Sequence, residues 1–137
     1  MQKTILSVNR KIENEYDINW SVEAGLSLSG HQVKSIRNGH VNIGNTYGYF
    51  DSGSIFIKNL FSTKEHESVR LLLNKSEIKK IIGLYSHEKR VIIFRELYDR
   101  KGIIKVELCV GERFTKHDHR RKLIEKDIRR QSKYNDY

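Results

Sequence analysis

The sequence lacks several features on which secreted and membrane proteins depend. Its 137 residues include one cysteine, Cys109, which excludes an internal disulfide and fits a reducing cytosol. No apolar run is long enough to span a membrane, and the N-terminus has no apolar segment of signal-peptide length. Proline is absent altogether, and we attach no function to that absence. A cytoplasmic protein without a membrane partner is therefore expected.

Positive charge is in clear excess and is spread along the chain. Lysine and arginine total 26 against 17 aspartates and glutamates, which gives a net charge of +9 and a pI near 9.7. Residues 1–110 carry +5 of this charge and residues 111–137 carry +4. A surplus shared by body and tail favours an extended polyanion as partner, most simply nucleic acid. A basic domain without such a partner is the alternative.

Residues 23–42 contain the most informative local pattern. Val22, Ala24, Leu26 and Leu28 alternate with polar residues, as in a half-buried strand, and Gly30 permits a sharp turn.

The period then changes to that of a short helix over residues 31–38. Val33 and Ile36 can point inward together, and Gly39 stands where a C-terminal cap belongs. The opposite side carries two cations and two hydrogen-bonding side chains: His31, Lys34, Arg37 and Asn38. Such a surface suits a phosphate backbone.

The rest of residues 1–110 reads as short strands and a second helix. Asn74 and Glu77 predict a capping box at the start of a helix that ends at Gly83, and residues 51–53 predict a hairpin turn. Strands are expected over 15–20 (continuing toward 28 through a bulge), 46–50, 54–60, 90–98 and 103–110. This pattern predicts a mainly β fold, either a small antiparallel barrel or an open sheet with helices on one face.

Residues 111–137 differ in composition from the body. They are dense in charge, and Leu123, Ile124 and Ile128 would give a helix only a thin apolar edge. Such an edge buries too little surface to offset the ordering entropy. The tail is therefore expected to be disordered when free and to become helical against RNA, the alternative being a solvated extension with no role.

Residues 23–42 also resemble the signature of the SsrA-binding protein (small protein B) family. The family pattern is Glu-Ala-Gly, apolar-x-Leu-x-Gly, then Glu-Val-Lys-Ser-Leu-Arg-x-Gly-Lys-x-Asn. Here Gln32, Ile36 and His40 replace the second Glu, the last Leu and the second Lys, and the rest matches. Residues 70–75 and 77–78 resemble the family further on, as do residues 118–120 and 123–130 in the tail.

The resemblance implies an OB-like RNA-binding barrel over residues 1–110 and a tail, 111–137, that is helical on the ribosome. It implies a non-enzymatic adaptor that binds the tRNA-like domain of transfer-messenger RNA and delivers it to stalled ribosomes for trans-translation. The sequence does not give the oligomeric state, and a monomer is expected. The tail would occupy the empty mRNA channel. The implied contacts to the tRNA-like domain are Asn9, Lys11, His31, Lys34, Arg37 and Asn42. The implied rRNA contacts are His117, Asp118, His119, Arg120, Lys126, Arg129 and Arg130.

The chain departs from the family pattern in three places. Arg113-Phe114-Thr115 stands where the family has Gly-Lys-Lys, the loop between Leu60 and Arg70 is short, and most of a lysine-rich leader is missing. These losses are expected to weaken RNA and ribosome binding without changing its kind. A general single-stranded RNA-binding protein with no ribosomal role is the competing interpretation.

No catalytic, metal or cofactor site is expected. The adjacent residues His117, Asp118 and His119 are unsuited to converge on one ion, and Cys109 is expected to be a structural thiol. Four aromatic residues on two predicted strands could stack on RNA bases, but packing in the barrel is favoured for them: Tyr47, Tyr49, Phe50 and Phe56.

Overall fold

The computed structural model describes residues 3–62, 68–86 and 89–114. The N-terminal half contains β1 (Thr4–Val8), α1 (Ile12–Glu15), β2 (Tyr16–Leu26), α2 (Gly30–Arg37), the 3₁₀ turn η1 (Ile43–Asn45) and β3 (Tyr47–Asp51). The C-terminal half contains β4 (Ser54–Lys58), β5 (Ser68–Leu72), α3 (Lys75–Tyr85), β6 (Arg90–Arg100) and β7 (Ile103–Arg113). In this part of the chain no helix is long and apolar enough to cross a membrane.

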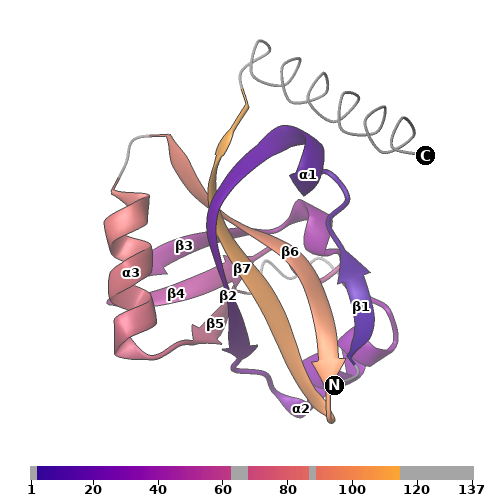
Figure 1. The fold of residues 1–137 in the computed structure, drawn as a ribbon. Helices are drawn as coiled ribbons and strands as arrows, with labels where there is room; N and C mark the ends of the chain where they lie inside the picture. The colour runs from indigo at the N-terminus through magenta and orange to yellow at the C-terminus, as the bar shows by residue number, and fades with distance from the viewer. Residues whose placement is uncertain (1–2, 63–67, 87–88, 115–137) are drawn as a thin grey trace, which may run out of the picture.

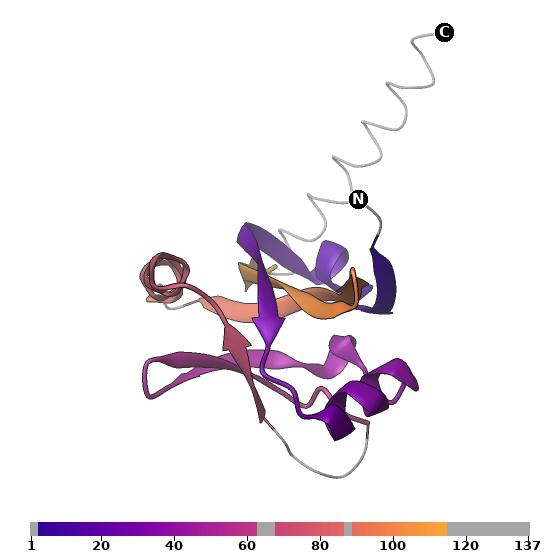
Figure 2. The ribbon, with the colours of Figure 1, turned by 90° about the horizontal axis from the view of Figure 1, so that it is seen from below.

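The seven strands of the described residues form one antiparallel sheet in the order β1-β6-β7-β2-β5-β4-β3 (Figure 1). The long strands β2, β6 and β7 make up most of one layer, and the short strands β3, β4 and β5 form the other (Figure 2). Strand β2 joins the layers, because Gly25 pairs with Lys105 of β7 on one side and with Leu72 of β5 on the other. The mainly β, OB-like antiparallel fold is thus confirmed.

The hydrogen-bonded closure that a barrel implies is absent from the described strands. Strands β1 and β3 stand at the two ends of the order, and neither pairs with the other. The turn η1 lies beside β1 instead, where the backbone N–H of Ile43 donates to Ser7 Oγ at 3.0 Å. Strand β3 meets β6 by packing of faces, since a Cβ on Gly48 would lie 2.3 Å from Ile92 Cγ2. At this side of the molecule, side-chain contacts therefore hold the two layers together. In a closed barrel, backbone hydrogen bonds between β1 and β3 would do so.

The core lies between the two layers. Phe94, Leu97, Val106 and Leu108 from one layer are buried against Ile55, Ile57, Val69 and Leu71 from the other. Ile36 of α2 and Ile81 of α3 are buried in the same cluster, so each helix is fixed by one fully inserted isoleucine.

Helix α3 starts as predicted and ends later than predicted. Asn74 Oδ1 accepts from the Glu77 N–H at 2.8 Å, and Glu77 Oε1 accepts from the Asn74 N–H at 2.9 Å. The helix continues through Gly83 to Tyr85, whose ring packs edge-on against Phe50 at 5.1 Å. That aromatic contact attaches the last turn of α3 to β3.

The hairpin between β3 and β4 is also confirmed. Asp51 pairs with Ser54, and the two turn residues Ser52 and Gly53 have φ angles of 51° and 79°. Positive φ at both positions is the requirement of a type I′ turn, which glycine meets without strain.

Replacing Gly48 with alanine tests the packing of β3 on β6. The added methyl group would overlap Ile92, so the free energy of unfolding should fall by about 1–3 kcal/mol. Urea unfolding followed by circular dichroism measures the change. Gly83→Ala is the matched control: its Cβ would meet nothing within 4 Å, and it should leave α3 equally stable or stabilise it by about 0.5–1 kcal/mol. A Gly48→Ala protein as stable as wild type would show that the layers do not meet there.

Candidate RNA interface

Helix α2 is defined at both ends by local hydrogen bonds. Ser29 caps its N-terminus, with Ser29 Oγ accepting from the Gln32 N–H at 3.2 Å and Gln32 Oε1 accepting from the Ser29 N–H at 2.9 Å. Gln32, which departs from the family pattern, therefore still completes a capping box. Gly39 follows the helix with φ of 81°, as expected for a C-terminal cap.

The helix presents the polar side that the sequence predicted. Ile36 is 1% exposed and Val33 is half-buried against the core, whereas His31, Lys34 and Arg37 are exposed. Lys34 makes no ion pair with any residue that the structure describes. Its charge is therefore available to an external anion.

Arg37 is held by the turn between β6 and β7. Its Nη1 donates to Asp99 Oδ2 at 2.6 Å and its Nη2 donates to the carbonyl of Gly102 at 3.2 Å. Asp99 Oδ1 also accepts from the Gly102 N–H at 2.8 Å. The Arg37 hydrogen bond, followed by that from Gly102, holds the pKa of Asp99 below its ordinary value. Sequence reasoning missed this pair because 62 residues separate its members.

Asn9 is buried, which the sequence did not indicate. It is 7% exposed, its Nδ2 donates to the Phe94 carbonyl at 3.2 Å, and its Oδ1 accepts from the Lys11 N–H at 3.2 Å. Its backbone N–H also donates to the carbonyl of Arg95 at 2.8 Å. Asn9 thus shapes the turn after β1, and its side chain is not displayed to a partner.

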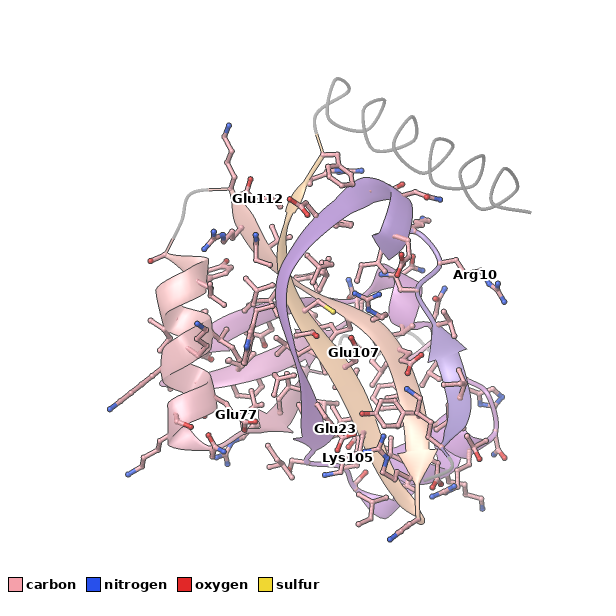
Figure 3. All side chains as sticks on the ribbon, in the orientation of Figure 1. Arg10, Glu23, Glu77, Lys105, Glu107 and Glu112 are labelled. Atoms are coloured by element: carbon pink, nitrogen blue, oxygen red, sulfur yellow. The ribbon has the colours of Figure 1, made fainter. Side chains whose placement is uncertain are left out.

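That turn instead displays two cations. Arg10 and Lys11 are both exposed, and Figure 3 shows Arg10 pointing away from the body of the protein. Arg10 was not among the predicted contacts, although it stands between two residues that were.

Asn42 lies next to the Asn9 turn. Its Oδ1 caps η1 by accepting from the Gly44 N–H at 2.9 Å, and a Cβ on Gly44 would lie 4.0 Å from Asn9 Oδ1. The structure therefore brings Asn9, Lys11 and Asn42 together at one place and His31, Lys34 and Arg37 at another. Residues 38–42 connect the two groups, and we call the whole surface the basic corner.

The predicted tail contacts lie outside the described residues. These are His117, Asp118, His119, Arg120, Lys126, Arg129 and Arg130. Strand β7 continues past Val110 to Arg113, which pairs with Tyr16, and the Phe114 N–H donates to the Glu15 carbonyl at 2.8 Å. The folded body thus extends at least to Phe114.

The prediction that Cys109 is a structural thiol is confirmed. The thiol is fully buried against Ile12 and Ile93, and burial raises its pKa to about 11. Such a thiol is a poor nucleophile at neutral pH. In the described part of the chain no group of three or more His, Cys, Asp or Glu side chains is placed to hold a metal ion.

A small two-layered β protein with a capped basic helix at its corner is the class that this fold and surface define. The family model described as SmpB protein matches residues 6–135, and the chain belongs to this family. The resemblance drawn from residues 23–42 is thereby confirmed.

Curated relatives agree with this assignment along nearly the whole chain. The SsrA-binding protein of Clostridium perfringens is 35% identical over 136 residues, covering 92% of this chain and 87% of the relative. The SsrA-binding protein of Clostridium kluyveri is 36% identical over 142 residues, covering 93% and 90%. A solved structure described as "tmRNA-SmpB: a journey to the center of the bacterial ribosome" shares the fold, with a TM-score of 0.64, 23% identity and coverage of 85% and 92%.

Removing the Arg37 side chain should change the titration of Asp99. In Arg37→Ala the pKa of Asp99 should rise toward the ordinary value of about 3.9. Because the folded-state pKa is depressed, the pair stabilises the fold above that value and loses its effect as the pH falls through the lower folded pKa. The stability difference between wild type and Arg37→Ala should therefore shrink on acidification.

Carboxyl-detected NMR titration measures the pKa, and urea unfolding at neutral and acidic pH measures the stability difference. Lys34→Ala, one turn earlier on the same helix, is the control and should alter neither quantity. An Asp99 pKa that is the same in wild type and Arg37→Ala would contradict the ion pair.

Proposed function

We propose that this protein is a non-enzymatic RNA-binding adaptor that binds the tRNA-like domain of transfer-messenger RNA and delivers it to stalled ribosomes in the cytoplasm. The observation that carries the proposal is the match of one family model to residues 6–135, which include the basic corner and all but the last two residues of the tail. The relatives are named for binding SsrA, and the solved neighbour is described as tmRNA-SmpB in the bacterial ribosome.

The basic corner is the proposed contact to the folded RNA. Lys34, Lys11 and Arg10 are exposed and can each neutralise a phosphate. His31 and Asn42, also exposed, can hydrogen-bond to phosphate or ribose.

Arg37 has a double role in this proposal. Two of its N–H groups are committed to Asp99 and Gly102, which fix the guanidinium plane, and the side chain is still 43% exposed. A fixed arginine loses less side-chain entropy when it binds a phosphate. Asn9 contributes indirectly, by shaping the turn that displays Arg10 and Lys11.

The tail is the proposed ribosomal element. Residues 115–137 follow the last described residue, and the seven tail residues named above are the proposed rRNA contacts in the empty mRNA channel. This division predicts that RNA binding and ribosome rescue can be separated by truncation.

Lys34→Ala should weaken binding to a fragment containing the acceptor arm and elbow of transfer-messenger RNA. The dependence of log K on log salt should become shallower by about one unit, because one phosphate contact is lost. Fluorescence anisotropy across a salt series measures both quantities. Lys79→Ala, which removes an exposed cation from α3, is the control and should change neither. The same series with an unstructured RNA of equal length should show weaker binding, and equal affinity for both RNAs would contradict the adaptor function.

A chain ending at Phe114 should retain RNA binding and lose the tagging of stalled peptides. The cut leaves β7 complete, including its pairing with Tyr16 and the Phe114 hydrogen bond to Glu15. RNA affinity and tagging in a reconstituted translation system are the two measurements. Loss of RNA binding by this stably folded truncated chain would disprove the division between body and tail.

A further inference from the structure

The outer face of the short-stranded layer carries a row of aromatic and basic side chains. In β5, Val69 and Leu71 are buried, so Ser68, Arg70 and Leu72 point outward, and the same alternation holds in β4. The strand register aligns Tyr49, Phe56 and Arg70 in one cross-strand row and Tyr47, Lys58 and Ser68 in the next. We call Tyr47, Tyr49, Phe56, Lys58 and Arg70 the aromatic stripe.

The position of three of these rings corrects the interpretation made from sequence. Packing in the barrel was favoured for four aromatic residues, and of these only Phe50 packs against the core cluster, with its ring also contacting the partly exposed Tyr85. Tyr49 and Phe56 are half-buried and stacked at 5.5 Å with 19° between their planes, and Tyr47 is 44% exposed at 6.4 Å from Tyr49. Tyr49 is further fixed by its hydroxyl, which donates to Ser68 Oγ at 2.7 Å.

The opposite face of the molecule has a different charge arrangement. The three arginines of β6 are each within ion-pair distance of a glutamate: Arg90 with Glu112 at 3.7 Å, Arg95 with Glu107 at 3.1 Å and Arg100 with Glu23 at 3.0 Å. Figure 3 shows Glu23 and Glu107 on neighbouring strands of this face. Its positive charge is therefore largely neutralised within the fold.

The cations of the aromatic stripe are not neutralised in this way. Neither Lys58 nor Arg70 forms an ion pair with a residue in the described ranges, although both adjoin aromatic rings in the strand register. Fixed rings interleaved with cations that no described residue neutralises match the chemistry of single-stranded nucleic acid, which offers a flat base and a phosphate at each nucleotide.

We propose that the aromatic stripe binds an unpaired RNA segment, with bases stacked on Tyr47 and the Tyr49–Phe56 pair and phosphates held by Lys58 and Arg70. The inference rests on the proposed function for the kind of partner, an RNA. It adds a second surface, on β3, β4 and β5, which is distinct from the basic corner. Paired regions of an RNA would meet the corner, and an unpaired loop or junction would meet the stripe.

Binding of the full chain to an unstructured RNA tests the proposal. The probe is a fluorescein-labelled oligomer of adenosine and cytidine, which cannot base-pair, of about 12 nucleotides. Tyr47→Ala should weaken binding about tenfold without changing the salt dependence, whereas Tyr47→Trp should retain or increase the affinity. Arg70→Ala should weaken binding and make the salt slope shallower by about 0.7.

Controls separate stacking from loss of structure and from binding elsewhere. Ile103→Ala removes a side chain that is 58% exposed, outside the stripe, and should leave the affinity unchanged. Phe56→Leu keeps an apolar side chain at a half-buried position and should weaken binding as Tyr47→Ala does. Photo-crosslinking with 5-iodouridine placed in the oligomer should label the peptide that contains residues 47–58.

Two results would overturn the stripe as an RNA site. One is equal affinity of Tyr47→Ala and Ile103→Ala proteins. The other is crosslinking confined to residues 115–137. If Tyr47→Ala instead abolished self-association without affecting RNA affinity, the stripe would be a contact between copies of this chain and the proposal would likewise be wrong.

The two proposals fail in different ways. If the stripe is wrong, oligomer binding is insensitive to Tyr47, while Lys34→Ala still weakens binding of the tRNA-like fragment. If the adaptor function is wrong, the tRNA-like fragment has no advantage over the oligomer, while Tyr47→Ala still weakens oligomer binding.

Discussion

The two-residue ladder between β2 and β5 is the constraint on which the rest of the structure depends. Gly25 pairs with both β7 and β5, Leu26 pairs with β5, and this ladder is the strand pairing that joins the two layers of the described chain. A Cβ on Gly25 would lie 3.3 Å from Leu72 Cβ, so a glycine eases the approach of the strands at that point. Helix α2 begins four residues after the ladder, and its position is therefore set by the joint. The Arg37–Asp99 pair then fixes the other end of the helix to the long-stranded layer.

The net charge of +9 describes the surface poorly, because the positive groups are used in two ways. On β6 and β7 the arginines face glutamates across the strands, where partly exposed pairs contribute little stability and mainly cancel one another's field. Lys34 of α2 and the cations of the Asn9 turn and the aromatic stripe form no ion pair with a described residue, and Arg37 pairs with Asp99 but stays 43% exposed. A polyanion is therefore attracted to particular sides of the protein, even though lysine and arginine are distributed along the whole sequence.

Local sequence patterns predicted the elements whose signals are complete within a few residues. The capping box at Asn74, the hairpin turn at residues 51–53 and the alternation in β7 depend on neighbours in the chain. The capping box at Ser29 was not predicted, although it too is formed by residues three apart. Strands β1 and β5 were missed: β1 has Ile5 and Val8 exposed at an edge, and β5 has only Val69 and Leu71 as buried residues. For β3, alternation separates Tyr47 and Tyr49 from Gly48 and Phe50 but leaves open which pair faces the core. The close approach of Ile92 to Gly48 decides this, and it depends on tertiary structure.

The departures from the family pattern at Gln32 and Arg113 differ in what they change in the protein. Gln32 in place of glutamate keeps both hydrogen bonds of the capping box, so the backbone of α2 is unaffected. What is lost is one negative charge beside the basic corner, which reduces repulsion of an approaching phosphate backbone. The change at Arg113 has a different effect. Arg113 lies at the end of β7, and its Nη2 is 3.8 Å from Glu15 Oε2. Glu15 thus partly neutralises the charge of Arg113. Lys116 is the first cation after Phe114, the last described residue. The change at Gln32 is therefore expected to favour RNA binding at the basic corner, whereas the loss of Gly-Lys-Lys leaves fewer cations at the start of the tail.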